Sequence, residues 1–190
     1  EKDGQWHAAN PDYEAVTTSL LNGLKLRGGE NPSLKGKKVL ILGAGGAARA
    51  IAWAMVNSGA LLTICNRTIE RAKELASDLG CQFCPWEHRA TGYADILINC
   101  TSVGMHPNVD DTPFKDSWFR EGMVVFDTVY TPENTLLLKQ ARERSCHTVT
   151  GLEMFVRQAA AQFERFTGKK APLEIMGKAL RRAISPVKQS

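Results

Sequence analysis

The sequence lacks several features that would define its class directly. No apolar run in its 190 residues approaches the roughly 20 that cross a bilayer, so a membrane protein is not expected. Its five cysteines are scattered and odd in number, which argues against a disulfide framework. There is no internal repeat and no low-complexity segment. These absences leave an ordinary globular domain, with 43% hydrophobic and 23% charged residues.

The chain also lacks an initiator Met and a strong net charge. It begins at Glu1, and its first residues read like the middle of a protein, so we expect a fragment or a processed product. A targeting segment could lie upstream, which leaves the compartment open between the cytoplasm and a plant plastid. The net charge of +4 comes from interspersed acidic and basic residues, which favours solvated faces over a nucleic-acid footprint.

No metal site is expected from the cysteines. Cys81 and Cys84 stand at a metal-like spacing with His88 nearby, but a structural zinc site needs four ligands and no second pair follows. The other three cysteines lie within or beside apolar segments, where small buried residues are expected: Cys65, Cys100 and Cys146.

Strand-like and helix-like segments alternate along the chain. Apolar periodicity and Gly or Pro boundaries predict strands over 38–42, 61–65, 95–100, 123–126 and 147–149. The same signals predict helices over 11–24, 47–57, 69–79, 133–144, 152–166 and 173–183. Such alternation indicates an α/β fold, a doubly wound parallel sheet with helices on both faces. Ligands of such sheets bind at the carboxyl ends of the strands.

A glycine-rich turn follows the first apolar strand. Residues 43–48 read Gly-Ala-Gly-Gly-Ala-Ala. Ala48 stands at the position where the common Gly-x-Gly-x-x-Gly pattern has its last glycine. The backbone N–H groups of such a turn can approach a pyrophosphate at the positive end of the next helix. Because strand, turn, helix and strand follow in order, the context predicts a Rossmann-like dinucleotide-binding fold.

The residues after the second strand indicate which dinucleotide the fold is expected to bind. NAD-preferring proteins place an acidic residue about 20 positions after the turn, whereas this chain has Asn66, Arg67 and Thr68. An amide, a guanidinium and a hydroxyl suit the 2′-phosphate of NADP. Thr68 could instead only cap the following helix, and Arg71 is either a second phosphate contact or a solvent-facing helix residue.

A third polar segment runs from Asn99 to Met105, where a buried strand breaks into a loop. Thr101 and its small neighbours could line the nicotinamide side, with Met105 as an apolar wall. From this stretch alone, a turn with local Ser/Thr hydrogen bonds is the better interpretation.

Together with two later motifs, these segments resemble the shikimate dehydrogenase family, particularly the form fused to 3-dehydroquinate dehydratase. The motifs occur in the family's order: Gly43 to Ala47, Asn66 to Thr68, Asn99 to Met105, Asp127 with Tyr130, and Gly151 with Met154 and Gln158. The resemblance covers residues 6–180 of this chain, approximately. In the family's enzyme, these residues correspond only to the later part of the protein. It implies NADPH-dependent, reversible reduction of 3-dehydroshikimate to shikimate in aromatic amino acid biosynthesis, in a cleft between an amino-terminal substrate domain and a Rossmann domain.

The resemblance also implies roles for individual residues. With the motif reasoning above, the expected cofactor contacts are Gly43, Ala44, Gly45, Gly46, Ala47, Asn66, Arg67, Thr68, Arg71, Thr101, Met105, Thr128 and Gly151. The expected substrate contacts are Tyr130, Gln158 and Gln162. The two glutamines are one helical turn apart and share a face, which could also be simply a polar helix face.

The family's catalytic pair is a Lys and an Asp. The Lys belongs to the substrate domain, to which no residue of this sequence corresponds. The Asp closes an Asn-Thr-Asp motif, for which this chain has Asn10, Pro11 and Asp12, so Asp12 is the candidate and Pro11 is a departure. A carboxylate near the Lys can hold its ammonium in position as proton donor. Asp12 could instead only favour the helix N-terminus electrostatically.

We therefore expect residues 1–30 to form a linking helix segment, 31–185 an NADP-binding Rossmann domain with C-terminal helices, and 186–190 a tail. The expected partners are a small-molecule substrate and a fused or upstream substrate domain, with no nucleic acid and no membrane. Poor activity is expected of this chain without the Lys. Two alternatives stay open: a quinate/shikimate dehydrogenase, and a non-catalytic NADP-binding module.

Overall fold

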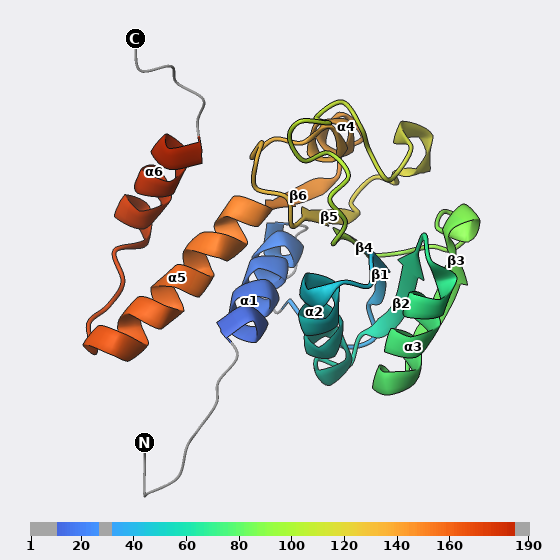
Figure 1. The fold of residues 1–190 in the computed structure, drawn as a ribbon, viewed down its shortest axis with the longest axis horizontal. Helices are drawn as coiled ribbons and strands as arrows, with labels where there is room; N and C mark the ends of the chain where they lie inside the picture. Colours follow the sequence, from blue (N-terminus) through green and yellow to red (C-terminus); the bar gives the residue numbers. More distant parts are fainter. Residues whose placement is uncertain (1–10, 27–31, 185–190) are drawn as a thin grey trace, which may run out of the picture.

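The computed structural model describes residues 11–26 and 32–184, and side chains within 13–25 and 32–184. Six parallel strands form one sheet in the order β3-β2-β1-β4-β5-β6 (Figure 1). The strands are β1 (Lys38–Leu42), β2 (Leu61–Asn66), β3 (Gln82–Pro85), β4 (Ile96–Asn99), β5 (Val124–Asp127) and β6 (His147–Thr150). This is the doubly wound order, and it confirms the predicted Rossmann-like fold.

The helices follow the predicted segments closely. They are α1 (Pro11–Leu26), α2 (Gly46–Asn57), α3 (Ile69–Leu79), α4 (Leu136–Glu143), α5 (Gly151–Thr167) and α6 (Leu173–Ile184). Gly80 and Gly168 end α3 and α5 in the left-handed conformation, at φ +64° and +67°. A residue with a Cβ is strained there, which is why glycine marks both helix ends.

One strand was not predicted. β3 has four residues, Gln82 and Phe83 are exposed, and Pro85 ends it. Short, half-exposed edge strands carry little hydrophobic pattern, so periodicity does not reveal them. β3 pairs only with β2, and a single turn of 3-10 helix, Trp86–His88, follows it.

Helices α1, α2 and α3 cover one face of the sheet. Their buried side chains pack on alternate strand residues such as Ile41, Ile64 and Phe126. A Cβ added at Gly23 of α1 would stand 3.0 Å from a methyl carbon of Val149, so α1 lies close against the sheet. None of the described helices is long and apolar enough to cross a membrane.

The other face is covered unevenly. α4 packs over β5 and β6, while the long segment between β4 and β5 contributes Phe114 and Phe119 to the same core. These two rings lie 5.1 Å apart. The expectation of helices on both faces is confirmed, but on this second face a folded loop does part of the covering.

α5 leaves the carboxyl edge of the sheet and lies alongside α1, with α6 on its far side (Figure 1). Arg165 Nη2 of α5 is 3.9 Å from Glu14 Oε1 of α1, so the beginning of α1 lies beside the later part of α5.

Candidate functional site

The turn after β1 is tightly constrained at its first glycine. Gly43 has φ +114°, and a Cβ there would lie 2.7 Å from the Cys100 carbonyl oxygen. The Gly43 N–H donates to the Cys65 carbonyl at 2.7 Å. Only glycine fits this position, because the turn passes directly between the ends of β2 and β4.

The helix that follows presents a bare N-terminus. Gly45 is the N-cap of α2 without a side-chain capping bond, and the first turn holds no acidic residue. Gly45, Gly46 and Ala47 are exposed, and added Cβ atoms at the two glycines would meet nothing within 4 Å. Ala48, in contrast, is fully buried against the sheet, as expected for the third motif position. The unbonded N–H groups and the helix dipole therefore suit an anion.

A cavity of about 430 Å³ opens in front of this turn, at the carboxyl ends of β1, β2 and β4. It lies where the strand order reverses, between β1 and β4. Several expected cofactor residues line it, together with residues that motif reasoning missed. The complete lining is Gly43, Ala44, Gly45, Asn66, Arg67, Trp86, Arg89, Cys100, Thr101, Ser102, Val103, Thr112 and Pro113.

Trp86 and Arg89 are the main additions. The Arg89 guanidinium carbon lies 4.2 Å from the centroid of the Trp86 ring and 4.9 Å from that of Trp118. Its Nε donates to the Pro113 carbonyl at 2.7 Å. Arg89 therefore fixes Trp86 at the cavity wall. In the sequence, the only local sign of this arrangement is that Trp86 stands three positions before Arg89. The contact of Arg89 with Trp118 joins distant parts of the sequence, so local pattern does not reveal it.

The predicted 2′-phosphate residues lie together at the end of β2. Asn66 Nδ2 donates to the Thr68 carbonyl at 2.8 Å, which closes the turn into α3. Thr68 is the N-cap of α3, but its side chain makes no capping bond. Arg67 and Arg71 are exposed, and neither forms an ion pair within the described part of the chain.

The segment after β4 is a turn with local hydrogen bonds, as the simpler interpretation predicted. The Thr101 N–H and hydroxyl donate to Asn99 Oδ1 at 3.0 and 2.7 Å. The Val103 N–H donates back to Thr101 Oγ1 at 3.2 Å. Thr101 nevertheless lines the cavity, so the two interpretations are compatible. Met105, which is 44% exposed, does not line the cavity.

A buried carboxylate organises the next stretch of the edge. Asp127 accepts hydrogen bonds from Asn99 Nδ2 at 3.0 Å, from the Val129 N–H at 3.0 Å and from the Thr135 hydroxyl at 2.7 Å. Burial raises the pKa of Asp127 to about 6. The three hydrogen bonds lower the pKa, but the effect of burial is larger. Asp127 was noted only as a motif position, and its structural role needed the fold.

Thr128 and Gly151 link this network to α5. The Thr128 N–H and hydroxyl both donate to the Asn99 carbonyl, at 3.0 and 2.9 Å. A Cβ on Gly151 would lie 2.5 Å from the Thr128 carbonyl oxygen, so the start of α5 touches this backbone directly. Hydrogen bonds and close contact thus connect the cavity residue Thr101 to the beginning of α5, although Thr128 and Gly151 do not line the cavity.

The predicted substrate residues follow along α5. Tyr130 is 43% exposed, and its ring centroid lies 5.5 Å from that of Phe155. Gln158 is half-buried and Gln162 is exposed, three and seven positions after Phe155 on the same helix. These positions share one helix face. The structure therefore brings Tyr130 to the side of α5 that carries both glutamines.

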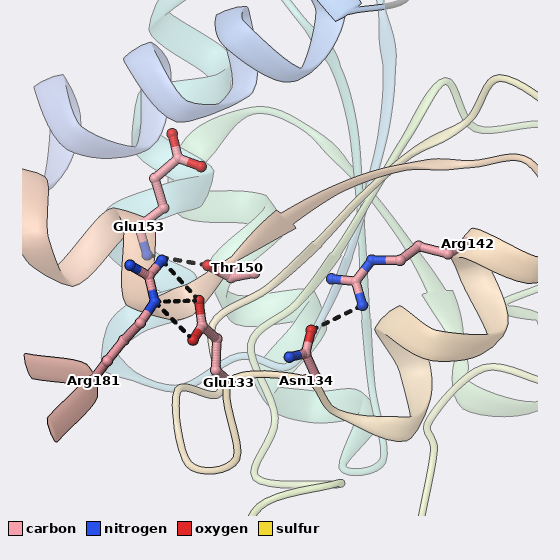
Figure 2. Close-up of polar contacts among 6 residues, drawn as sticks. All are labelled: Glu133, Asn134, Arg142, Thr150, Glu153 and Arg181. Atoms are coloured by element: carbon pink, nitrogen blue, oxygen red, sulfur yellow. Dashed lines mark hydrogen bonds and ion pairs between the residues drawn. The ribbon is translucent and has the colours of Figure 1, made fainter. Parts of the chain in front are cut away.

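One ion pair and one further hydrogen bond hold the loop after Tyr130 in place (Figure 2). Arg181 of α6 donates from Nε to Glu133 Oε2 at 3.1 Å, and Arg142 of α4 donates to Asn134 Oδ1 at 2.8 Å. Nearby, Thr150 caps α5 by accepting from the Glu153 N–H at 3.2 Å. α6 thus reaches back to the loop that carries the substrate candidate.

Asp12 lies near the beginning of α1, at its second residue, but its side chain is outside the described residues. Neither its predicted catalytic role nor its alternative role at the helix N-terminus is tested. No cluster of three metal-ligating side chains occurs among the described residues.

Comparison with known proteins identifies the chain's relatives. A family model described as shikimate/quinate 5-dehydrogenase matches residues 26–134, and a model of the shikimate 5′-dehydrogenase C-terminal domain matches residues 151–181. The chain belongs to the shikimate/quinate 5-dehydrogenase family.

Two curated relatives illustrate the match. The shikimate dehydrogenase (NADP(+)) of Methanosarcina acetivorans is 44% identical over 160 residues, covering 80% of this chain and 57% of the relative. The chloroplastic bifunctional 3-dehydroquinate dehydratase/shikimate dehydrogenase of Arabidopsis thaliana is 40% identical, covering 92% of this chain and 30% of the relative. The chain thus spans about half, or less, of the length of these relatives.

A solved structure shares the fold. The shikimate 5-dehydrogenase of Thermus thermophilus, determined in complex with NADP(H) and shikimate, is 35% identical with a TM-score of 0.75. The match covers 92% of this chain and 62% of that one. The family resemblance inferred from the ordered motifs is confirmed.

Proposed function

We propose that this chain is the NADP-binding part of a shikimate dehydrogenase, which reversibly reduces 3-dehydroshikimate to shikimate. We further propose that residues 31–185 form the dinucleotide domain, with 1–30 linking it to a substrate domain and 186–190 as a tail. The observation that carries the proposal is the cavity at the strand-order reversal, which has a bare helix N-terminus on one side and Arg67 on the other.

The residues of this cavity fit a dinucleotide. The turn at Gly43 has no space for a side chain, while Gly45 and Gly46 leave open space before α2. A pyrophosphate at this N-terminus would accept hydrogen bonds from the backbone N–H groups of the first turn of α2. Within the described residues, no side chain caps these groups. Trp86, fixed by Arg89, offers an aromatic wall for a base.

Arg67 and its neighbours favour NADP over NAD. The Arg67 guanidinium and the Thr68 hydroxyl lack side-chain partners in the described structure, and no acidic residue takes the place that would bind a ribose 2′-hydroxyl. Guanidinium groups bind phosphate by charge-assisted hydrogen bonds. Arg71, one turn into α3, can add a second cation beside it.

The substrate would lie where the cavity's edge meets α5. When bound, the nicotinamide supplies or accepts the hydride that the reaction moves. Tyr130, Gln158 and Gln162 offer a hydroxyl and two amides to the hydroxyl and carboxylate groups of a shikimate-like acid. Thr101, Met105, Thr128 and Gly151 shape the edge between the two ligands.

Asp12 would act with a Lys of the family's substrate domain. Its carboxylate would hold the ammonium close to the reacting oxygen, where a proton must arrive as the hydride adds to carbon. No residue of this sequence corresponds to that Lys, so Asp12 alone cannot supply the proton. We therefore expect NADPH binding with slow turnover.

Titration of this chain with NADPH, followed by steady-state oxidation of shikimate, tests the proposal. The expected result is saturable NADPH binding with turnover far below that of a two-domain shikimate dehydrogenase measured alongside. Absence of NADPH binding would reject the proposed function. Near-normal turnover would reject the claim that essential groups lie outside these residues.

Quinate is the second candidate substrate, because the matched family model covers quinate dehydrogenases as well. Joining the chain to a Lys-bearing substrate domain and comparing kcat/KM for the two acids separates the candidates. If neither acid is oxidised while NADPH still binds, the non-catalytic module is the correct description.

A further inference from the structure

A second cavity, of about 640 Å³, extends over the face of β1, β2 and β3 that no α-helix of the described residues covers, which we call the helix-free face. Residues from these strands, including Leu40, Thr63 and Cys84, line it. Lys38 and Arg89 add positive charge at its wall, and no Asp or Glu is among its lining residues. This cavity is larger than the proposed cofactor cavity, and Arg89 is the one lining residue that the two cavities share.

A pair of neighbouring thiols lies at this cavity, and Cys84 is the member of the pair that lines it. Cys65 of β2 and Cys84 of β3 are direct partners in the parallel ladder, so their side chains share the helix-free face. Paired strands lie about 4.8 Å apart, within the Cα separation that a disulfide accepts. All five cysteines are free thiols, and β3 is a four-residue strand at the edge of the sheet.

In the sequence, Cys81 and Cys84 stand out only as possible metal ligands, and the fold also argues against a disulfide between them. Cys81 and Cys84 form a Cys-x-x-Cys spacing, but the residues between them are extended in β3. Three residues of extended chain separate Cα atoms by about 10 Å, which is too far for a disulfide. The fold therefore assigns Cys84 to Cys65 and leaves Cys81 as a neighbour on the same cavity wall.

The two thiols differ in accessibility and acidity. Cys84 is half-buried and lines the cavity, whereas Cys65 is fully buried. The neighbouring Cys65 thiol, which itself donates to the Pro85 carbonyl at 3.4 Å, lowers the pKa of Cys84, and the Arg89 charge lowers it further against the effect of burial. The same contact with Cys84, reinforced by burial, raises the pKa of Cys65. Cys84 is therefore the more accessible and the more acidic thiol of the pair.

We propose that Cys65 and Cys84 form an oxidisable dithiol that exchanges with an anionic low-molecular-weight disulfide entering the helix-free cavity. The Cys84 thiolate attacks one sulfur of the incoming disulfide, which forms a mixed disulfide and releases one thiolate that takes up a proton. The Cys65 thiol then loses its proton and attacks Cys84 Sγ, which forms the Cys65–Cys84 bond and releases the second thiol. Two protein thiols are oxidised and one disulfide is reduced to two thiols.

Incubation with oxidised glutathione, followed by free-thiol counting and disulfide mapping by mass spectrometry, tests this proposal. The expected result is loss of two thiols, with a linked pair of peptides containing Cys65 and Cys84. Cys81→Ser, the matched control from the same cavity wall, should behave like the unaltered chain. Cys65→Ser should instead accumulate one glutathione on Cys84, and Cys84→Ser should leave Cys65 reduced.

Labelling of the unaltered chain adds a test that needs no variant. Cys84 should react with iodoacetamide about tenfold faster than Cys81, because its thiolate is stabilised. Equal labelling rates, a Cys81–Cys84 linkage, or no linkage in oxidised glutathione would overturn the proposal. Cofactor binding plays no part in these readouts, so they stand or fall independently of the proposed function.

Discussion

At the ends of β1 and β2 the polar groups face the cavity without side-chain partners, whereas at the ends of β4 and β5 they are bonded to one another. Within the described residues, the α2 N-terminus, the Arg67 guanidinium and the Thr68 hydroxyl have no capping bond or ion pair. Asn99, Thr101, Asp127 and Thr135, in contrast, form one continuous network.

The difference suggests different roles for two halves of the carboxyl edge of the sheet. The first half is the ends of β1 and β2, and the second half is the ends of β4 and β5. Unbonded donors and cations cost the protein free energy unless water or a ligand satisfies them, so the first half is arranged to bind an anion. A saturated buried network rigidifies the backbone that carries it, so the second half holds the loops to Tyr130 and α5 in place. Substitutions in the first half should change cofactor affinity, and substitutions in the second should change stability.

The largest effect is expected at the point where the halves touch. Gly43→Ala places a Cβ 2.7 Å from the Cys100 carbonyl oxygen at φ +114°. Strain and overpacking together should lower the free energy of unfolding by about 4 kcal/mol. Urea unfolding measures this. Gly45→Ala, whose Cβ meets nothing within 4 Å, is the control and should change stability by less than about 0.5 kcal/mol. Equal effects would refute the close approach.

The second prediction concerns Asp127, whose folded-state pKa of about 6 stands above the ordinary 3.8. The native state therefore binds the proton more tightly than the unfolded chain does, and stability is lost as pH rises from about 4 to about 6. The full loss is about 3 kcal/mol, since one pKa unit corresponds to about 1.4 kcal/mol. Asp127→Asn should remove this component from urea unfolding measured across that range. Parallel pH profiles for both proteins would contradict the raised pKa.

The third prediction compares two threonines at helix N-cap positions, Thr135 and Thr68. The Thr135 hydroxyl donates to Asp127 and accepts from the Leu138 N–H, whereas the Thr68 side chain caps nothing in α3. Thr135→Ala should cost about 2 kcal/mol of unfolding free energy, and Thr68→Ala less than about 0.5 kcal/mol. Thermal and urea unfolding of the pair measure the contrast. A loss at Thr68 as large as that at Thr135 would show that both halves are structural.

The same contrast explains what the sequence could and could not reveal. Gly43, Gly45 and the Asn66–Thr68 turn follow directly after strands, so the local pattern predicted their place in the fold. Within the described residues, five of the six strands and all six α-helices were predicted for the same reason. β3 was missed because four half-exposed residues ending in proline carry no period-2 signal.

The missed site residues depend on distant contacts. Trp86 reaches the cavity wall through Arg89, which is held by Trp118 and Pro113 from a later loop. Asp127 owes its raised pKa to burial at the edge of β5, which no local motif encodes. The pairing of Cys84 with Cys65 likewise needs the order of β2 and β3 in the sheet.

The most direct test of the contrast between the two halves of the sheet edge is the affinity of the Arg67→Ala variant for NADPH and for NADH, measured by calorimetric titration. Loss of one exposed charge-assisted contact should weaken NADPH binding by about 1.5 kcal/mol, or roughly tenfold, and leave NADH nearly unchanged. Arg182→Ala, an exposed arginine on α6, is the control and should change neither affinity. Equal weakening of both dinucleotides, or no weakening of NADPH, would contradict the proposal that the end of β2 binds a 2′-phosphate.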